Sequence, residues 1–159
     1  MKARCFLINS FIILLVINAF TVSAQTSAQT MYYQKLKTDL LSHYYQPVTE
    51  VNVSLMNGQL YTLPFDVAPG VTFKFFLVAP VEISASGIEL QDDFHFRIKN
   101  NLLVRNGNTF LNELTYYSTH SGKRYAVFSC VNPLHSASDV NILIYKENGY
   151  FANYEFLPH

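Results

Sequence analysis

The stretch VNVSLMNGQLYTLPF, residues 51–65, decides the fold, because apolar and polar side chains alternate along most of it. A period of two is typical of a β-strand with one buried face. In the middle, Asn57-Gly58 predicts a β-hairpin, since both residues tolerate the positive φ that a type I′ turn requires. Pro64 lies in the returning strand and indicates an edge strand or a bulge, because proline cannot donate a ladder hydrogen bond. The stretch therefore predicts antiparallel β-structure.

The same period continues to the end of the chain, with turn residues every eight to twelve positions. Further strands are expected over 71–77, 81–86, 93–98, 102–104, 110–117, 124–131 and, as a pair joined at Asn148-Gly149, over 140–157. No helical pattern of 10–15 residues separates them, which argues against a parallel α/β sheet. The sequence thus predicts a mainly β protein: an antiparallel, jelly-roll-like β-sandwich of eight to ten strands. The row Phe94, Phe96 and Ile98 is expected to face the core.

The segment SGKRYAVFSC, residues 121–130, combines a Ser-Gly turn with a strand that is apolar on both faces. Such a strand is expected in the interior of a sheet, covered on both sides. Cys130 ends it, and the only other cysteine, Cys5, lies in the leader described below, so no internal disulfide is expected. Cysteine is among the residue types most often buried, which predicts that Cys130 is an inert part of the core.

A single amphipathic helix is predicted over residues 31–45. The apolar side chains of this segment recur at spacings of three and four, from Tyr33 to Tyr44. Thr30 is suited to cap the helix, and Pro47 prevents its continuation. The apolar side of the helix needs a partner, for which the face or the open end of a sheet is the simplest choice.

The first 24 residues have the layout of a secretory signal peptide. A positive start with Lys2 and Arg4 precedes a short apolar run, and Val22-Ser23-Ala24 provides small residues for cleavage. Cleavage is expected after Ala24, with Ala28 as the alternative. The interpretation is a signal peptide 1–24, a linker 25–30 and one domain 31–159 that contains the helix. The alternative for the leader is an uncleaved anchor helix.

Composition excludes several classes of partner. Removal of the leader leaves nine basic and eleven acidic residues with no run of like charge, which argues against nucleic-acid or anionic-membrane surfaces. No later apolar stretch is long enough to span a membrane. The mature chain is therefore expected to be secreted or periplasmic. Asn52-Val53-Ser54 is a glycosylation sequon that matters only in a eukaryotic secretory pathway.

Three segments resemble the bacterial pre-peptidase C-terminal domain, a small β-sandwich appended to exported enzymes. They are NGQLYTLPF (57–65), IELQDDFHFRI (88–98) and SGKRYAVFSC (121–130), which together anchor most of residues 50–147. The resemblance implies a jelly-roll-like sandwich that acts as an accessory or binding module. It implies no catalytic residues in this chain.

Few residue patterns indicate chemistry. Cys130 with His120 or His135 is the candidate pair for a cysteine hydrolase, which would need an exposed thiol with a lowered pKa. Glu89, Asp92 and Asp93 form the one tight acidic cluster, but their spacing matches no calcium-binding loop and indicates solvated turn carboxylates.

The histidines lack the i, i+4 spacing of a helical zinc site. No catalytic, cofactor-binding or metal-ligating residue is therefore predicted, and no cofactor.

Two hypotheses on function remain. The first is an exported, non-catalytic binding or accessory module that recognises a protein, a glycan or another envelope component through a sheet face or loop end. It rests on the leader, the sandwich pattern and the lack of a recognisable catalytic set. The alternative is a small secreted hydrolase whose site is assembled from Cys130 and His120 or His135. The two differ in whether such groups converge in a concave pocket.

Overall fold

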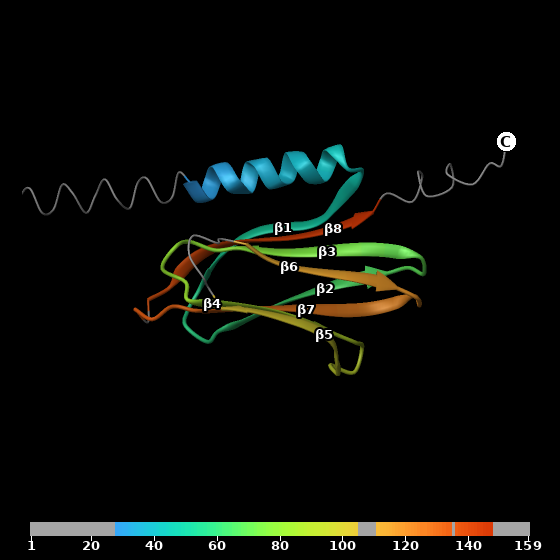
Figure 1. Ribbon diagram of the computed structural model, residues 1–159. Helices are drawn as coiled ribbons and strands as arrows, with labels where there is room; N and C mark the ends of the chain where they lie inside the picture. The colour runs from blue at the N-terminus through green and yellow to red at the C-terminus, as the bar shows by residue number, and fades with distance from the viewer. Residues whose placement is uncertain (1–27, 105–110, 135, 148–159) are drawn as a thin grey trace, which may run out of the picture.

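The computed structural model describes residues 28–104, 111–134 and 136–147, in which one helix lies against a sandwich of two sheets (Figure 1). The helix spans residues 28–42. The strands are β1 Tyr45–Leu55, β2 Leu60–Val67, β3 Val71–Val78, β4 Ala85–Gln91, β5 Arg97–Val104, β6 Leu111–Ser118, β7 Gly122–Val131 and β8 Ser138–Glu147. No helix within these residues has the length and apolarity needed to cross a membrane. The leader and the expected Asn148-Gly149 hairpin lie outside the described residues.

The strand order is that of a jelly roll. One sheet has the order β1-β8-β3-β6 and the other β2-β7-β4-β5, and each strand runs antiparallel to its neighbours. The chain is thus folded back on itself, so that the first strand pairs with the last, the second with the seventh, and so on inward. The predicted antiparallel, jelly-roll-like sandwich is confirmed. Pro64 lies on β2, at the edge of its sheet, as its missing N–H requires.

The prediction of a hairpin at Asn57-Gly58 is wrong. β1 and β2 belong to different sheets, so these residues form a corner that carries the chain from one layer to the other. Long-range hydrogen bonds hold the corner: the Gly58 N–H donates to the carbonyl of Cys130, and the Asn132 N–H donates to the Asn57 side chain. Gly58 does adopt the positive φ, 73°, that the sequence suggests. The positive φ of Gly58 was therefore predictable, whereas Asn57 lacks the positive φ that a type I′ turn requires and β2 pairs with β7 instead of β1.

The core lies between the two sheets and is built from the alternating rows. Phe65 of β2 packs against Phe73 and Phe75 of β3, with ring centroids 5.4 and 5.2 Å apart. Cys130 belongs to this cluster and is 1% exposed. Its strand, β7, lies between β2 and β4, so the predicted interior position is confirmed. The outer face of β7 is less covered than expected, since Val131 is 45% exposed.

The helix covers the outer face of the first sheet. Leu40 is buried with four side chains of β3 and β8, namely Phe76, Val78, Leu143 and Tyr145, in a second apolar cluster. The helix begins and ends three residues earlier than predicted, so that Thr30 lies inside it and Tyr45 already starts β1. Residues 28–30, expected in a linker, form its first turn. Tyr117, on β6, is outside this cover and is 60% exposed.

A polar cluster fixes the helix to the sheet. The carboxylate of Glu50 on β1 accepts hydrogen bonds from the hydroxyls of Tyr33 and Tyr145 and from the Lys37 ammonium, whose nitrogen lies 2.5 Å from it. Burial alone would raise the pKa of Glu50, but the bonds from Lys37 and Tyr145 outweigh it and lower the pKa below its ordinary value. Burial and the same carboxylate raise the pKa of Tyr145. The cluster therefore keeps Glu50 ionised under the helix.

Candidate functional site

Within the described residues, no helix lies against the outer face of the sheet β2-β7-β4-β5 (Figure 1). Side chains that are cross-strand neighbours form rows across it, because paired residues of antiparallel strands point the same way. One row runs from Leu60 through Ser129 and Gly87 to Leu102. The two leucines are 65% and 66% exposed, and Gly87 between them has no side chain. The row therefore has apolar walls with a hollow at its centre.

This hollow is part of a groove of about 360 Å³. Its walls and floor come from all four strands of the sheet: Leu60, Gly87, Ile88, Glu89, Gln91, Arg97, Asn100, Asn101, Leu102, Val127 and Ser129. A Cβ atom added at Gly87 would lie 2.7 Å from the Ser129 Oγ atom. The missing side chain thus gives the groove its depth, since any other residue would fill the space and press on Ser129.

The polar end of the groove is organised around Glu89. One oxygen of its carboxylate accepts from Gln91 Nε2 at 2.7 Å, and the other from Arg97 Nε, also at 2.7 Å. The Gln91 Oε1 atom lies 3.2 Å from His95 Nδ1, and the His95 ring lies on that of Tyr125, with centroids 4.4 Å apart. These contacts hold an acid, an amide and a guanidinium at fixed positions on an otherwise open surface.

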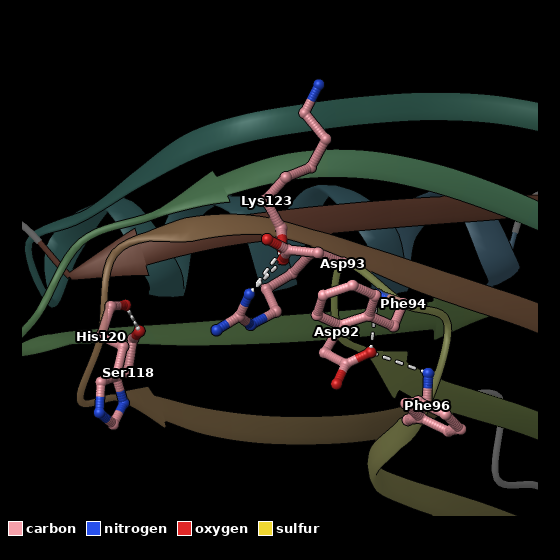
Figure 2. A network of polar contacts seen from close by, with 8 residues as sticks. Asp92, Asp93, Phe94, Phe96, Ser118, His120 and Lys123 are labelled. Carbon is pink, nitrogen blue, oxygen red and sulfur yellow. Dashed lines mark hydrogen bonds and ion pairs between the residues drawn. The ribbon is translucent and has the colours of Figure 1, made fainter.

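The loop that follows β4 is a tight turn closed by Asp92. Its carboxylate accepts hydrogen bonds from the N–H groups of Phe94 and Phe96 (Figure 2). Its carbonyl accepts from the N–H of His95. His95 has a φ of 63°, a left-handed conformation that costs a non-glycine residue about 1–3 kcal/mol. The turn therefore holds His95 over Tyr125 at a conformational cost.

The expectation that Phe94, Phe96 and Ile98 face the core is wrong. Phe94 and Phe96 are 79% and 71% exposed, because β4 ends at Gln91 and the turn carries both rings outward at the end of the sandwich. Ile98 is displaced by a bulge between Leu90 and Gln91 and is also exposed. The alternation of residues 93–98 is that of a strand, but the side-chain bonds of Asp92 favour a turn there.

The three acidic residues of the 89–93 cluster do not converge. Glu89 binds Gln91 and Arg97 in the groove, and Asp92 caps its own turn. Asp93 is turned away from Asp92 and forms an ion pair with Arg124, 2.6 Å from Oδ1 to Nη1 (Figure 2). Among the residues that the structure describes, no group of three or more His, Cys, Asp or Glu side chains is placed to hold a metal ion.

The structure does not bring Cys130 and His120 together. His120 lies in the turn before β7 and Cys130 near the other end of that strand, about 26 Å along it at 3.3 Å per residue. Cys130 points into the core, and burial raises the pKa of its thiol, which opposes the thiolate that a nucleophile requires. His135 lies outside the described residues.

A second hollow, of about 380 Å³, lies at the seam between the helix and the first sheet. Lys74 and His43, two of the side chains that line it, have partners within the fold. Lys74 forms an ion pair with Glu113 at 3.2 Å, and His43 Nδ1 is 2.7 Å from the carbonyl of Asp39 in the preceding helical turn. The groove over Gly87, which is open and lined by an arranged polar network, is the better candidate site.

The sequence did not single out this groove. Its residues belong to four strands that are separated along the chain, and each looks like an ordinary member of a solvent-facing row. Gly87 within a strand was the available signal, because a glycine there often marks a close approach or a bulge.

No family model matches this sequence, and no curated protein matches it at a significant level. Similar solved structures include the pre-peptidase C-terminal domain of a collagenase from Bacillus anthracis, with a TM-score of 0.46 and 15% identity, covering 60% of this chain and 87% of that one. The resemblance expected from the sequence is thereby confirmed as a weak one.

Two larger proteins are also similar to this chain. One is a family GH115 4-O-methyl-α-glucuronidase, with a TM-score of 0.44, 9% identity, and coverage of 65% of this chain and 18% of that one. The other is an arabinose-bound family GH51 α-L-arabinofuranosidase, with a TM-score of 0.35, 11% identity, and coverage of 70% and 24%. This chain thus spans only a small part of either enzyme.

Proposed function

We propose that this chain is an exported, non-catalytic binding module that holds its ligand in the groove over Gly87. The proposal of export to the periplasm or the medium is supported by the signal-peptide layout of residues 1–24. The main support is the groove itself. The outer face of the sheet β2-β7-β4-β5 is hollowed there, and its polar side chains are held in place by hydrogen bonds to one another. A concave site with apolar walls and a few fixed polar groups is the usual form of a binding site.

The hydrolase alternative has less support. It needs a thiol that reaches a substrate, whereas Cys130 is in the core and His120 is at the other end of its strand. The described residues that line the groove include Ser129 but no histidine or cysteine, and His95 contacts only the Gln91 side chain among the polar residues of the lining. The polar groups of the groove are therefore assigned to binding.

The test is retention of a partner by the immobilised mature chain, residues 25–159, from envelope or culture-medium proteins and from a glycan panel. Gly87→Leu fills the hollow. Thr115→Leu, at an exposed position of β6 on the other sheet, adds the same side chain as a matched control. A retained partner, once purified, should bind the wild-type and Thr115→Leu chains alike and Gly87→Leu at least about tenfold more weakly, the equivalent of about 1.4 kcal/mol.

Thermal unfolding of each variant shows whether Gly87→Leu still folds, and Asn100→Ala provides a second groove variant without added bulk. Binding that is unchanged in both groove variants would overturn the proposal. Turnover of a generic ester or peptide that disappears in Cys130→Ala would favour the hydrolase instead.

A further inference from the structure

We infer that the ligand of the groove is an uncharged glycan chain. The inference rests on the proposed function and adds the chemical class of the ligand. It depends on four features of the groove: its charge balance, its hydrogen-bonding groups, its apolar walls and the strands from which it is built.

The charged side chains of the groove neutralise each other. Among the residues that the structure describes, Glu89 and Arg97 are the acidic and basic residues that line it, and they form one ion pair at 2.7 Å. A polyanion needs unpaired cations and a polycation needs unpaired carboxylates, because charge complementarity governs the encounter and exclusion of charged partners. The groove has neither in excess, so a ligand without net charge fits it best.

Hydrogen-bonding capacity remains after the internal bonds are formed. Each oxygen of Glu89 uses one acceptor site for Gln91 or Arg97, and the Arg97 guanidinium uses only its Nε–H in this network. A carboxylate has about four acceptor sites and a guanidinium five N–H donors, so this network leaves acceptor sites on Glu89 and donors on Arg97 for a ligand. Asn100 adds an amide beside them. Sugar hydroxyls, which both donate and accept, match such a mixed set.

Apolar walls accompany these planar polar groups. Leu60 and Leu102 lie on either side of the Gly87 hollow, and Val127 is the neighbour of Glu89 on β7. A pyranose ring has C–H faces and a hydroxyl-bearing edge, so it can lie between apolar walls while its edge meets Glu89, Gln91, Arg97 or Asn100. The groove follows β4 from Gly87 to Gln91. These four residue steps span about 13 Å, which is long enough for more than one sugar ring.

The location of the groove disfavours an extended peptide. Its floor is the face of β7 and β4, the two interior strands, whose backbone groups are already paired with β2 and β5 and with each other. A peptide that binds by strand addition needs the free backbone groups of a sheet edge. On this sheet face, the backbone amides of a peptide would contact apolar side chains and find few hydrogen-bond partners. The hydroxyl groups of a glycan project from the ring edges and can reach the few polar side chains.

The experiment is affinity electrophoresis of the mature chain through gels that contain a soluble neutral polysaccharide: a glucan, a mannan, a galactan or a xylan. Gels with polygalacturonate, chitosan or casein represent anionic, cationic and protein ligands. The variants are Gln91→Ala and Asn100→Ala in the groove, with Thr115→Ala on the opposite sheet as the matched control. Titration calorimetry with the corresponding oligosaccharide then measures affinity.

We expect retardation by at least one neutral polysaccharide, with each groove variant weakened about tenfold at most, since one neutral hydrogen bond is lost per substitution. Thr115→Ala should bind like the wild type. Affinity should change little between low and high salt, because no net charge is involved.

Retardation by a charged polysaccharide that is suppressed by salt would overturn the inference, as would the absence of retardation by every neutral one. Retention of casein or another protein that depends on Gln91 and Asn100 would also overturn it, while leaving the proposed function intact. Neutral-glycan binding that is unchanged in both groove variants would reject the groove itself, and with it the proposed function.

Discussion

The two outer faces of the sandwich differ in what covers them. The helix 28–42 lies on the sheet β1-β8-β3-β6 (Figure 1). It buries large apolar side chains such as Leu143, and Lys37 of the helix binds Glu50 of β1. On the sheet β2-β7-β4-β5, leucines of similar size stay two-thirds exposed beside a polar network. The first face is a second core, and the second is a surface with a shaped groove.

The difference separates stability from binding within one fold. Burial of apolar surface stabilises the folded state in proportion to the area buried, so the side chains under the helix contribute to the free energy of unfolding. The ion pair of the groove, with Arg97 largely exposed, adds little to stability, as is usual for surface pairs. Substitutions on the two faces should therefore have unequal effects, and three experiments test this.

The largest expected effect is that of Leu143→Ala under the helix. Leu143 is fully buried, and truncation of a buried leucine costs about 2–5 kcal/mol because a cavity remains. Leu102→Ala, on the open face, is the matched control and should change the free energy of unfolding by less than about 0.5 kcal/mol. Urea unfolding followed by circular dichroism measures both. Equal losses would contradict the distinction between the two faces.

An intermediate effect is expected for Glu50→Gln, and it should depend on pH. The folded-state pKa of Glu50 is lowered, so its ionisation stabilises the fold above the ordinary carboxyl pKa of about 4.3, and this contribution is lost as the pH falls through the folded pKa. At pH 7 the variant should lose about 1–3 kcal/mol, since Tyr33, Lys37 and Tyr145 lose a charged acceptor.

The measurement is the free energy of unfolding of both chains between pH 3 and pH 7. The difference between them should shrink toward acid. Glu113→Gln, which removes the charge from the more exposed ion pair with Lys74, is the control and should show little difference at any pH. A constant loss across the range for Glu50→Gln would show that its charge does not hold the helix.

The third experiment needs no large change in stability. It compares how fast thiols on the two sides of the sheet β2-β7-β4-β5 react with an alkylating reagent. Cys130 faces the core with a raised thiol pKa, so an alkylating reagent should modify it in the native state only as fast as the protein opens. A cysteine introduced by Leu102→Cys in a Cys130→Ser background should react at once. Rapid native labelling of Cys130 would reject its burial and restore the hydrolase hypothesis.

Much of the fold was predictable from short-range pattern. The alternation in residues 51–65, the apolar strand 124–131 and the three-and-four spacing near residue 36 gave the strands, the interior position of β7 and the helix. A signal for the covered face was also present, because residues 75–78 and 142–145 are apolar on both sides of their strands. Such runs need cover on two faces, and the helix supplies the second.

From the sequence alone one could infer which side chains share a face on strands such as β2 and β3, that the chain turns at Asn57-Gly58, and that Cys130 is buried, because these depend on the period of two and on local φ preferences. Only the tertiary structure decided that Asn57-Gly58 joins two sheets, that the helix lies on β3 and β8, and that Gly87, Glu89 and Arg97 share a groove. Pairing brings together strands far apart in the chain, and alternation states which way a side chain points without stating which strand will lie beside it.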